Sequence, residues 1–251
     1  MFDHVTLRVS DRDAAERFYS TVLAELGIGP PERNEDFVEW GDFLIAQAHD
    51  AKPLTQGLHV GFVAPSREHV DAFHRAGVAA GARDDGAPGP RPQYSDDYYG
   101  GFLLDLDGNS AEAVTHGFLR SDGVVDHLWV RVADLAASRR FYDAITPFAR
   151  LQRVADEPTL VRYRRTGTGG GSLTLVQGEQ PTVDVHIAFS ADDDATVQAF
   201  HEAIVAAGYR DDGAPGLRDH YSPGYYGAFV LDPDGNSVEL VHHHYARGAG
   251  R

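Results

Sequence analysis

The sequence predicts an α+β protein made of two tandem domains, each built from two strand–helix–strands modules. Three observations support this fold class. The segment DHVTLRVSDRDAAERFY at 3–19 recurs as DHLWVRVADLAASRRFY at 126–142. Residues 82–112 align without gaps to 209–239, with 21 of 31 positions identical by direct count. Each repeat also contains the order strand, helix, strands twice, so we expect four similar modules.

The elements of the first domain, predicted over residues 1–118, follow from apolar periodicity. An alternating stretch at 4–9 predicts a strand, and Ser10 or Asp11 can cap a helix from about 14 to 26 that Gly27 ends. An irregular Gly-Ala-Pro-Gly loop is expected at 86–89. The remaining elements are strands at 37–40 and 43–48, a strand at 58–63, a helix from 65 to 81, and strands at 99–104 and 110–115.

The second domain, predicted over residues 122–246, repeats this order after the short polar link 120–123. We expect its Gly-Ala-Pro-Gly loop at 213–216 and its hairpin turn at Asp234-Gly235. The predicted elements are a strand at 127–132, a helix at 135–145, strands at 160–164 and 172–177, a strand at 184–189, a helix at 193–207, and strands at 226–231 and 237–242.

Composition and charge narrow the classes of partner. A formal net charge of −16 makes nucleic acid or an anionic membrane an unexpected partner, and no apolar run approaches the ~20 residues of a membrane span. The chain has no cysteine, which excludes disulfides and thiolate metal sites and is compatible with the cytoplasm. The first residues already have the pattern of a strand, so no signal peptide is expected. We expect a cytoplasmic protein with a small-molecule substrate or ligand.

Histidines and a glutamate recur at matched positions of the predicted strands. Each domain has one His near the start of the first strand of each module and one Glu on its last strand. Because side chains alternate along a strand, the apolar neighbours of each His face the helix and the His faces the other way. Two imidazoles and one carboxylate with open positions suit a divalent metal that also binds substrate. The alternative is hydrogen-bonded structural histidines and solvated glutamates. The two expected sets, one per domain, are His4/His59/Glu112 and His127/His186/Glu239.

At these residues the chain resembles the vicinal oxygen chelate superfamily, the glyoxalase / bleomycin-resistance / extradiol-dioxygenase group. The resemblance covers both domains through DHVTLRV…RFY, GLHVGFVA and YYGAFVLDPDGNSVELVHH. It implies four βαβββ modules whose curved mixed sheets form cups. It also implies a divalent metal ion (Fe, Mn, Zn or Ni) on the same six residues: His4, His59, Glu112, His127, His186 and Glu239.

Departures from the family pattern narrow the expected chemistry. Leu44 and Thr174 stand where glyoxalase I-like enzymes place a fourth, acidic ligand, so a three-ligand centre is expected. His220 lies 19 residues before Glu239, as in extradiol dioxygenases, but Phe229 replaces the expected tyrosine. Tyr221, Tyr225 or Tyr226 would have to substitute. We predict His220 and Tyr226 as the catalytic pair, and the second domain as the active one.

Two functions from different classes remain open on the sequence. The first is a metal-dependent enzyme of dioxygenase, lyase or isomerase type acting on a small oxygen-chelating molecule. The second is a metal-free protein that binds an antibiotic or another small molecule. In either case Arg8, Arg131 and Trp129 are the predicted substrate-binding residues, with a structural salt bridge or core packing as alternatives. The chain is expected to be a monomer or a homodimer.

Overall fold

The computed structural model describes residues 1–167 and 170–245, and it contains four βαβββ modules in sequence order. Module 1 consists of β1 (His4–Val9), α1 (Arg12–Ala24), β2 (Glu32–Arg33), β3 (Phe37–Trp40) and β4 (Phe43–Gln47). Module 2 consists of β5 (His59–Val63), α2 (Arg67–Ala79), β6 (Arg83–Pro90), β7 (Tyr99–Leu104) and β8 (Ser110–Thr115).

The second half of the chain repeats this order. Module 3 consists of β9 (Val125–Val132), α3 (Leu135–Ala149), β10 (Leu151–Glu157), β11 (Leu160–Arg165) and β12 (Ser172–Gln177). Module 4 consists of β13 (His186–Ser190), α4 (Asp194–Ala206), β14 (Arg210–Leu217), β15 (Tyr225–Leu231) and β16 (Ser237–His243). The predicted α+β class and the four modules are confirmed.

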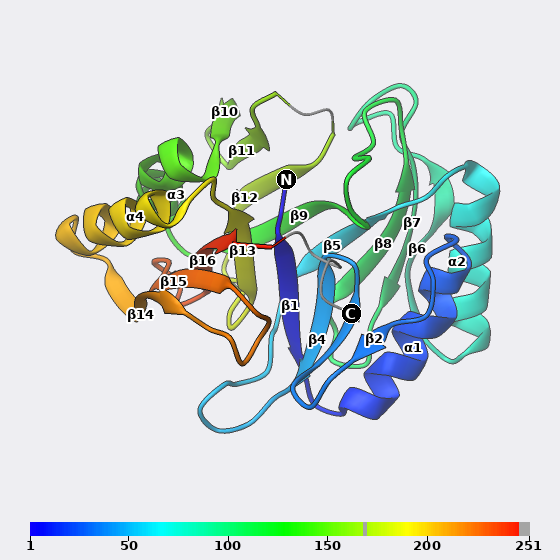
Figure 1. The fold of residues 1–251 in the computed structure, drawn as a ribbon. Helices are drawn as coiled ribbons and strands as arrows, with labels where there is room; N and C mark the ends of the chain where they lie inside the picture. Colours follow the sequence, from blue (N-terminus) through cyan, green and yellow to red (C-terminus); the bar gives the residue numbers. More distant parts are fainter. Residues whose placement is uncertain (168–169, 246–251) are drawn as a thin grey trace.

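The modules combine into two eight-stranded mixed sheets, and each sheet contains one module from each sequence repeat (Figure 1). The first sheet joins modules 1 and 4 in the order β14-β15-β16-β13-β1-β4-β3-β2. The second sheet joins modules 3 and 2 in the order β10-β11-β12-β9-β5-β8-β7-β6. Antiparallel pairing of β1 with β13, and of β5 with β9, forms the two junctions. Each sequence repeat therefore contributes one module to each sheet.

This pairing corrects the expectation that each sequence domain forms a cup of its own. The division at 1–118 and 122–246 remains a prediction about the sequence repeat, while the sheets follow the pairs 1–4 and 2–3. The physical reason is that the first strand of a module leaves one edge unpaired after its own parallel neighbour is in place. A similar first strand satisfies that edge, and here it comes from the other repeat.

One apolar core lies between the sheets and beneath the helices. Helix α1 contacts α2, and α3 contacts α4, as two pairs at opposite sides of the molecule (Figure 1). Phe43 of the first sheet meets Phe62 of the second with ring centroids 4.9 Å apart. Asp11, Asp134 and Asp193 cap three of the helices through their carboxylates. Because side chains alternate along each strand, the sheet face that points away from this core is left for polar side chains. No helix in the described ranges combines the length and apolar character needed to cross a bilayer.

Several boundaries differ from the sequence prediction. The two Gly-Ala-Pro-Gly segments lie inside β6 and β14 rather than in loops. Both strands are sheet edges with shifts of register, positions that tolerate proline because one row of N–H groups needs no partner. Helix α3 continues through Pro147 to Ala149, past the predicted end at 145. The two-residue β2 and the polar β10 carry too little apolar alternation to be predicted.

Two candidate metal centres

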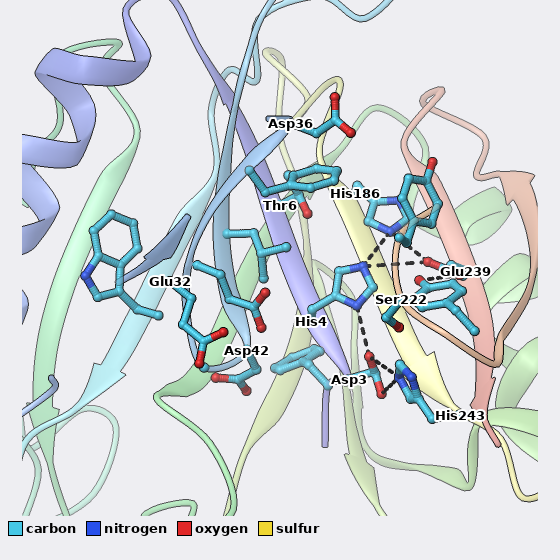
Figure 2. A pocket seen from close by; sticks show the side chains of 18 of the residues that line it. Asp3, His4, Thr6, Glu32, Asp36, Asp42, His186, Ser222, Glu239 and His243 are labelled. Carbon is cyan, nitrogen blue, oxygen red and sulfur yellow. Dashed lines mark hydrogen bonds and ion pairs between the residues drawn. The ribbon is translucent and has the colours of Figure 1, made fainter. Parts of the chain in front are cut away.

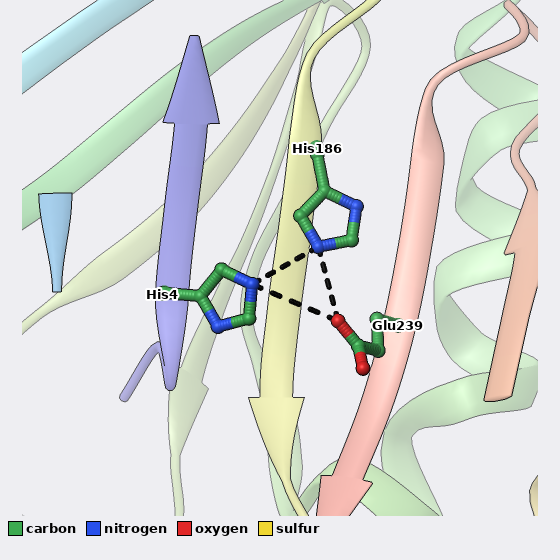
Figure 3. Close-up of side chains that lie close together, drawn as sticks. All are labelled: His4, His186 and Glu239. Atoms are coloured by element: carbon green, nitrogen blue, oxygen red, sulfur yellow. Dashed lines mark hydrogen bonds and ion pairs between the residues drawn. The ribbon is translucent and has the colours of Figure 1, made fainter. Parts of the chain in front are cut away.

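The first candidate centre consists of His4, His186 and Glu239 on three neighbouring strands of the first sheet (Figure 3). The two Nε2 atoms lie 3.1 Å apart, and Oε2 of Glu239 lies 3.1 Å from His186 Nε2 and 3.6 Å from His4 Nε2. All three residues are buried. Strands β1, β13 and β16 therefore direct three metal-ligating atoms to one point.

The second candidate centre consists of His59, His127 and Glu112 on β5, β9 and β8. Its two Nε2 atoms lie 3.3 Å apart, and Oε2 of Glu112 lies 2.9 Å from His59 Nε2 and 3.2 Å from His127 Nε2. The arrangement repeats that of the first centre, with the same atom types at similar distances.

The grouping by sequence domain, His4/His59/Glu112 and His127/His186/Glu239, is corrected by this geometry. His4 joins the His and Glu of module 4, and His127 joins those of module 2. The correction has the same cause as the arrangement of the sheets, because β1 lies beside β13 and β9 lies beside β5. Each centre takes one ligand from one repeat and two from the other.

Neighbouring groups orient the histidines so that Nε2 lone pairs face each centre. At the first centre, His4 Nδ1 contacts the carboxylate of Asp3 at 3.0 Å. His186 Nδ1 contacts Ser237 Oγ at 3.1 Å, and that hydroxyl donates to Asp212. A carboxylate can only accept, and a hydroxyl that donates elsewhere also accepts, so both Nδ1 atoms carry the proton. The Nε2 atom of each neutral ring is then free to bind a metal.

The second centre has matching partners. His127 Nδ1 contacts Asp126 at 2.9 Å, and His59 Nδ1 contacts Ser110 Oγ at 3.1 Å. The Ser110 hydroxyl donates to Asp85 at 2.9 Å. The supporting carboxylates and serines are therefore duplicated along with the ligands.

A tyrosine fixes the glutamate at each centre. Tyr225 OH donates to Glu239 Oε1 at 2.7 Å, and Tyr98 OH donates to Glu112 Oε1 at 2.7 Å. Each glutamate thus presents only Oε2 toward the histidines. The backbone opposite is glycine, Gly227 and Gly100, where a Cβ would overlap the carboxylate.

These residues fit a divalent metal ion. Two donor atoms bound at right angles, each about 2.1 Å from an ion, are about 3 Å apart. The ligand atoms of both centres lie near that separation. Two Nε2 lone pairs and a carboxylate oxygen brought so close together repel one another unless a cation or a proton lies among them. The donor set, two imidazoles and one carboxylate, is that of non-haem iron centres with open positions.

The two centres hold protons differently in the metal-free chain. Burial disfavours charge on His127, but hydrogen bonds to Asp126 and Glu112 outweigh it and raise the His127 pKa to about 9. Burial alone would raise the pKa of Glu112, whereas hydrogen bonds from His127 and His59 lower it to about 2. At the first centre, burial lowers the pKa of His186. The raised pKa of His127 and the lowered pKa of Glu112 favour a proton between these two side chains, in the place where a metal ion would bind.

The cavities above the centres differ in size. The first centre lies in a cavity of about 1580 Å³, whose wall includes Arg8, Phe37 and Tyr221. Figure 2 shows His4, His186 and Glu239 among the side chains that line it. The second centre opens into about 280 Å³, where Trp129 and Tyr94 pack against each other with ring centroids 5.7 Å apart. The first cavity is large enough for a drug-sized molecule, and the second is not.

The predicted substrate-binding residues lie in these cavities. Arg8 is half-buried in the first, and its Nη1 donates to the Asp184 carbonyl at 3.5 Å. Arg131 and Trp129 line the second cavity, where Trp129 lies edge-on to His59 at 6.4 Å. Leu44 lines the first cavity, and Thr174 accepts a hydrogen bond from Arg162, so the position of a fourth acidic ligand holds no acid at either centre.

The predicted catalytic pair separates in the structure. His220 is exposed at the wall of the first cavity, with its ring 4.2 Å from that of Tyr221. Tyr226 faces α4, where its hydroxyl accepts from Gln198 at 2.9 Å, so it does not reach the centre. Tyr225 takes that place. The hairpin could have given this answer, because Tyr225 pairs with His243 in the same phase as Phe229 with Glu239.

A third group, Asp194, His242 and His244, lies outside both cavities. His242 Nδ1 and His244 Nε2 lie 2.7 and 2.9 Å from the same Asp194 oxygen. Asp194 begins α4, where a carboxylate and its histidine partners form an ordinary ion-paired helix end. This group therefore needs no metal to account for it.

Comparison with known proteins agrees with this architecture. The fold is similar to glyoxalase I from Zea mays, with a TM-score of 0.68 at 19% identity, over 96% of this chain and 92% of that one. It is equally similar to a putative dioxygenase from Bacillus subtilis, with a TM-score of 0.68 at 16% identity, over 99% and 86% of the two chains.

Two further matches each cover just under half of the chain. A glyoxalase/bleomycin resistance protein from Albidiferax ferrireducens T118 is 36% identical over 46% of this chain and 99% of its own, with a TM-score of 0.43. A comparison with proteins of curated function finds no match. The model of the Glyoxalase/Bleomycin resistance protein/Dioxygenase superfamily matches residues 124–240. With this match, and with the same modules repeated in its first half, the chain belongs to this superfamily, also called the vicinal oxygen chelate superfamily.

Proposed function

We propose that the protein is a divalent-metal-dependent enzyme whose active site is the first centre. One observation carries this proposal: His4, His186 and Glu239 converge, with their Nε2 and Oε2 atoms turned inward, on a cavity of about 1580 Å³. A buried triad of this composition is suited to a cation that also binds a substrate, and the cavity provides room for one. The proposed metals are Fe, Mn, Zn and Ni.

The proposed substrate is a small molecule that chelates through two neighbouring oxygens. When bound, the ion would polarise these oxygens as a Lewis acid. Tyr225 holds Glu239 in a monodentate position, and Asp3 and Ser237 hold the histidines, so the open side faces the cavity. Leu44 contributes no ligand, which leaves more than one position for the substrate.

The remaining side chains of the cavity have separate proposed roles. His220 is the candidate for proton transfer, because its imidazole lies on the cavity wall and is exposed to solvent. Arg8 is the candidate to bind an anionic group of the substrate. Phe37 and Tyr221, whose rings lie 6.2 Å apart, supply an apolar wall for a ring. This set favours dioxygenase chemistry, with lyase or isomerase chemistry next, in a cytoplasmic monomer or homodimer.

The alternative is metal-free binding of a cationic molecule in the same cavity. Glu32 and Glu39 pair directly across β2 and β3 and both line the cavity. With Asp36 and Asp42 they give the cavity wall a negative charge that favours a cationic ligand. Antibiotic binding of this kind needs the acidic wall but none of the three ligands.

Metal analysis separates the two functions. Protein prepared without affinity metal and then supplied with Fe²⁺, Mn²⁺, Zn²⁺ or Ni²⁺ should hold about two ions per chain. His186→Ala should remove the ion of the first centre, and the matched control His59→Ala should remove that of the second. A catechol added to the cobalt-substituted protein should perturb the spectrum of the His59→Ala variant and leave that of His186→Ala unchanged. Protein that remains metal-free under these conditions would refute the enzyme proposal.

A further inference from the structure

Each centre is backed by an aspartate and a second histidine that lie outside the ligand set. The Asp3 carboxylate lies 3.0 Å from His4 Nδ1 and 3.1 Å from His243 Nε2 (Figure 2). The Asp126 carboxylate lies 2.9 Å from His127 Nδ1 and 3.2 Å from His116 Nε2. We call Asp3 with His243, and Asp126 with His116, the backing pairs.

The backing pairs also contact the tyrosines that hold the glutamates. The His243 ring lies edge-on to Tyr225 at 5.1 Å, and the His116 ring stacks on Tyr98 at 5.3 Å. Each outer histidine therefore contacts both the aspartate that holds the first-strand histidine and the tyrosine that holds the glutamate.

In the backing pairs the aspartate carboxylates are buried, the outer histidines are half-buried, and each pair crosses the junction between repeats. The Asp3 and Asp126 side chains are 7% and 3% exposed, and those of His243 and His116 are 16% and 15% exposed. Asp3 belongs to the first repeat and His243 to the second, whereas Asp126 and His116 show the reverse. Burying a carboxylate costs free energy unless hydrogen-bond donors surround it. An aspartate at the same place in both junctions therefore needs a defined set of donor partners there.

The other contacts of the two aspartates differ. Ser190 Oγ donates to Asp3 at 3.2 Å, whereas the Arg120 backbone N–H donates to Asp126 at 3.1 Å. Both aspartates contact a candidate ligand histidine and an outer histidine. The contacts that recur at both centres are therefore those that link each aspartate to its candidate metal centre.

We propose that Asp3 with His243, and Asp126 with His116, are positioning residues that set the metal affinity of the first and second centres respectively. The inference rests on the proposed metal binding. Each aspartate keeps the Nδ1–H tautomer of its ligand, aims Nε2 at the centre, and raises the basicity of the ring. Each outer histidine orients the aspartate and, through its ring, the tyrosine.

The first test needs no metal. Long-range ¹H–¹⁵N correlation on the metal-free protein reports which nitrogen of each neutral imidazole carries the proton. Neutral His4 should be the Nδ1–H tautomer in the wild type, and Asp3→Asn should mix the two tautomers. A wild-type His4 with its proton on Nε2 would contradict the proposal, whether or not the protein binds metal.

The second test measures the affinity of one centre at a time by chelator competition with Zn²⁺. In the His59→Ala background, Asp3→Asn should weaken the remaining centre by about 10- to 100-fold, the usual effect of losing such a partner. Asp126→Asn, the matched control, should leave it unchanged. The His186→Ala background should reverse the two results. Equal losses from both substitutions in one background would show a general loss of stability and overturn the assignment.

The outer histidine is tested by a conservative replacement. His243→Gln keeps a side-chain N–H near Asp3 and should retain the zinc affinity of the first centre within about threefold. His243→Phe removes the donor but keeps a ring against Tyr225, and it should weaken the affinity by about tenfold. If the phenylalanine variant binds zinc as tightly as the wild type, His243 has no positioning role. If no zinc binds to the wild type, the proposed function fails together with the effect on affinity, and the tautomer measurement remains to judge the orientation of His4.

Discussion

The two centres have the same ligands and the same supporting groups, but the cups around them differ. At matched strand positions Thr6, Leu44 and Glu39 of the first cup correspond to Trp129, Thr174 and Arg162 of the second. Large side chains reduce the second cavity to about 280 Å³, against about 1580 Å³ for the first. Arg162 lies over the Trp129 ring at 5.8 Å, which keeps both side chains in place.

This contrast separates two tasks within one fold. The candidate ligands, the aspartates and the tyrosines form the same arrangement at both centres, so under the proposed function they would account for binding an ion. The cup walls have diverged in size and charge, so they account for what else can enter. We therefore expect two bound ions but only one substrate site per chain, and each of the following substitutions or measurements tests that difference between the centres.

The largest effect is expected from the glutamates. Glu239→Gln replaces the anionic ligand of the first centre and should lower its metal affinity by more than about 100-fold, because two neutral imidazoles alone hold a divalent ion weakly. The matched change Glu112→Gln should do the same at the second centre. Isothermal titration should show one lost site in each case. Loss of both sites from one substitution would mean that the centres are coupled.

The residue opposite the first-strand histidine differs between the centres, and a substitution at Gly61 tests whether this difference matters. A Cβ at Gly61 would overlap the His127 ring, whereas the first centre has Ala188 opposite His4. Gly61→Ala should displace His127 and weaken the second centre by about 10- to 100-fold. Ala188→Gly, the reciprocal change, removes a methyl group from the first and should have a small effect. Zinc titration of both variants checks this, and an unchanged second centre in Gly61→Ala would disprove it.

Proton release should also distinguish the centres. The folded-state pKa of His127 is raised to about 9, so His127 keeps its proton below that pH, and a metal ion must displace it. The affinity of the second centre should therefore fall about tenfold per pH unit as the pH drops below 9. The lowered pKa of His186 predicts a flatter dependence at the first centre near pH 7. Calorimetry in buffers of different ionisation enthalpy counts the protons, and equal counts would contradict the difference.

The smallest effect is expected from Trp129→Thr, which gives the second cup the residue found in the first. Trp129 is half-buried, so the loss should be about 1–2 kcal/mol of unfolding free energy, less than for a fully buried tryptophan. The variant should also admit a catechol to the second centre, seen as a second change in the cobalt spectrum. Thr6→Trp is the converse and should exclude the catechol from the first centre. An unaltered spectrum in both variants would show that these residues do not control access.

Local patterns in the sequence predicted most of the elements and all six candidate ligands. Alternation is a property of neighbouring residues, so it placed His4 and Glu239 on the cup faces without knowledge of the strand order. The partner of β1 was beyond reach, because pairing across about 180 residues depends on packing of whole modules rather than on local pattern. For the same reason the backing contacts of Asp3, which join opposite ends of the chain, could not be predicted.

Other misses have local causes. The edge strands β6 and β14 carry glycine and proline, which signal turns more strongly than strands. Tyr225 and Tyr226 are adjacent, so a shift of one residue decides which of them faces the centre. The difference in cavity size follows from Trp129 on β9 and from side chains on β3 and β11, and only the last two segments have little sequence in common.

The pairing of first strands between the repeats constrains how this protein can evolve. After a duplication, one copy can usually lose its site while the other keeps it. Here a repeat that lost its first-strand histidine would damage the centre of its sibling, because His4 serves Glu239 and His127 serves Glu112. Neither copy is free to decay alone. New specificity must therefore arise by changing the cup residues of one module pair, which is where the two halves of this chain have diverged.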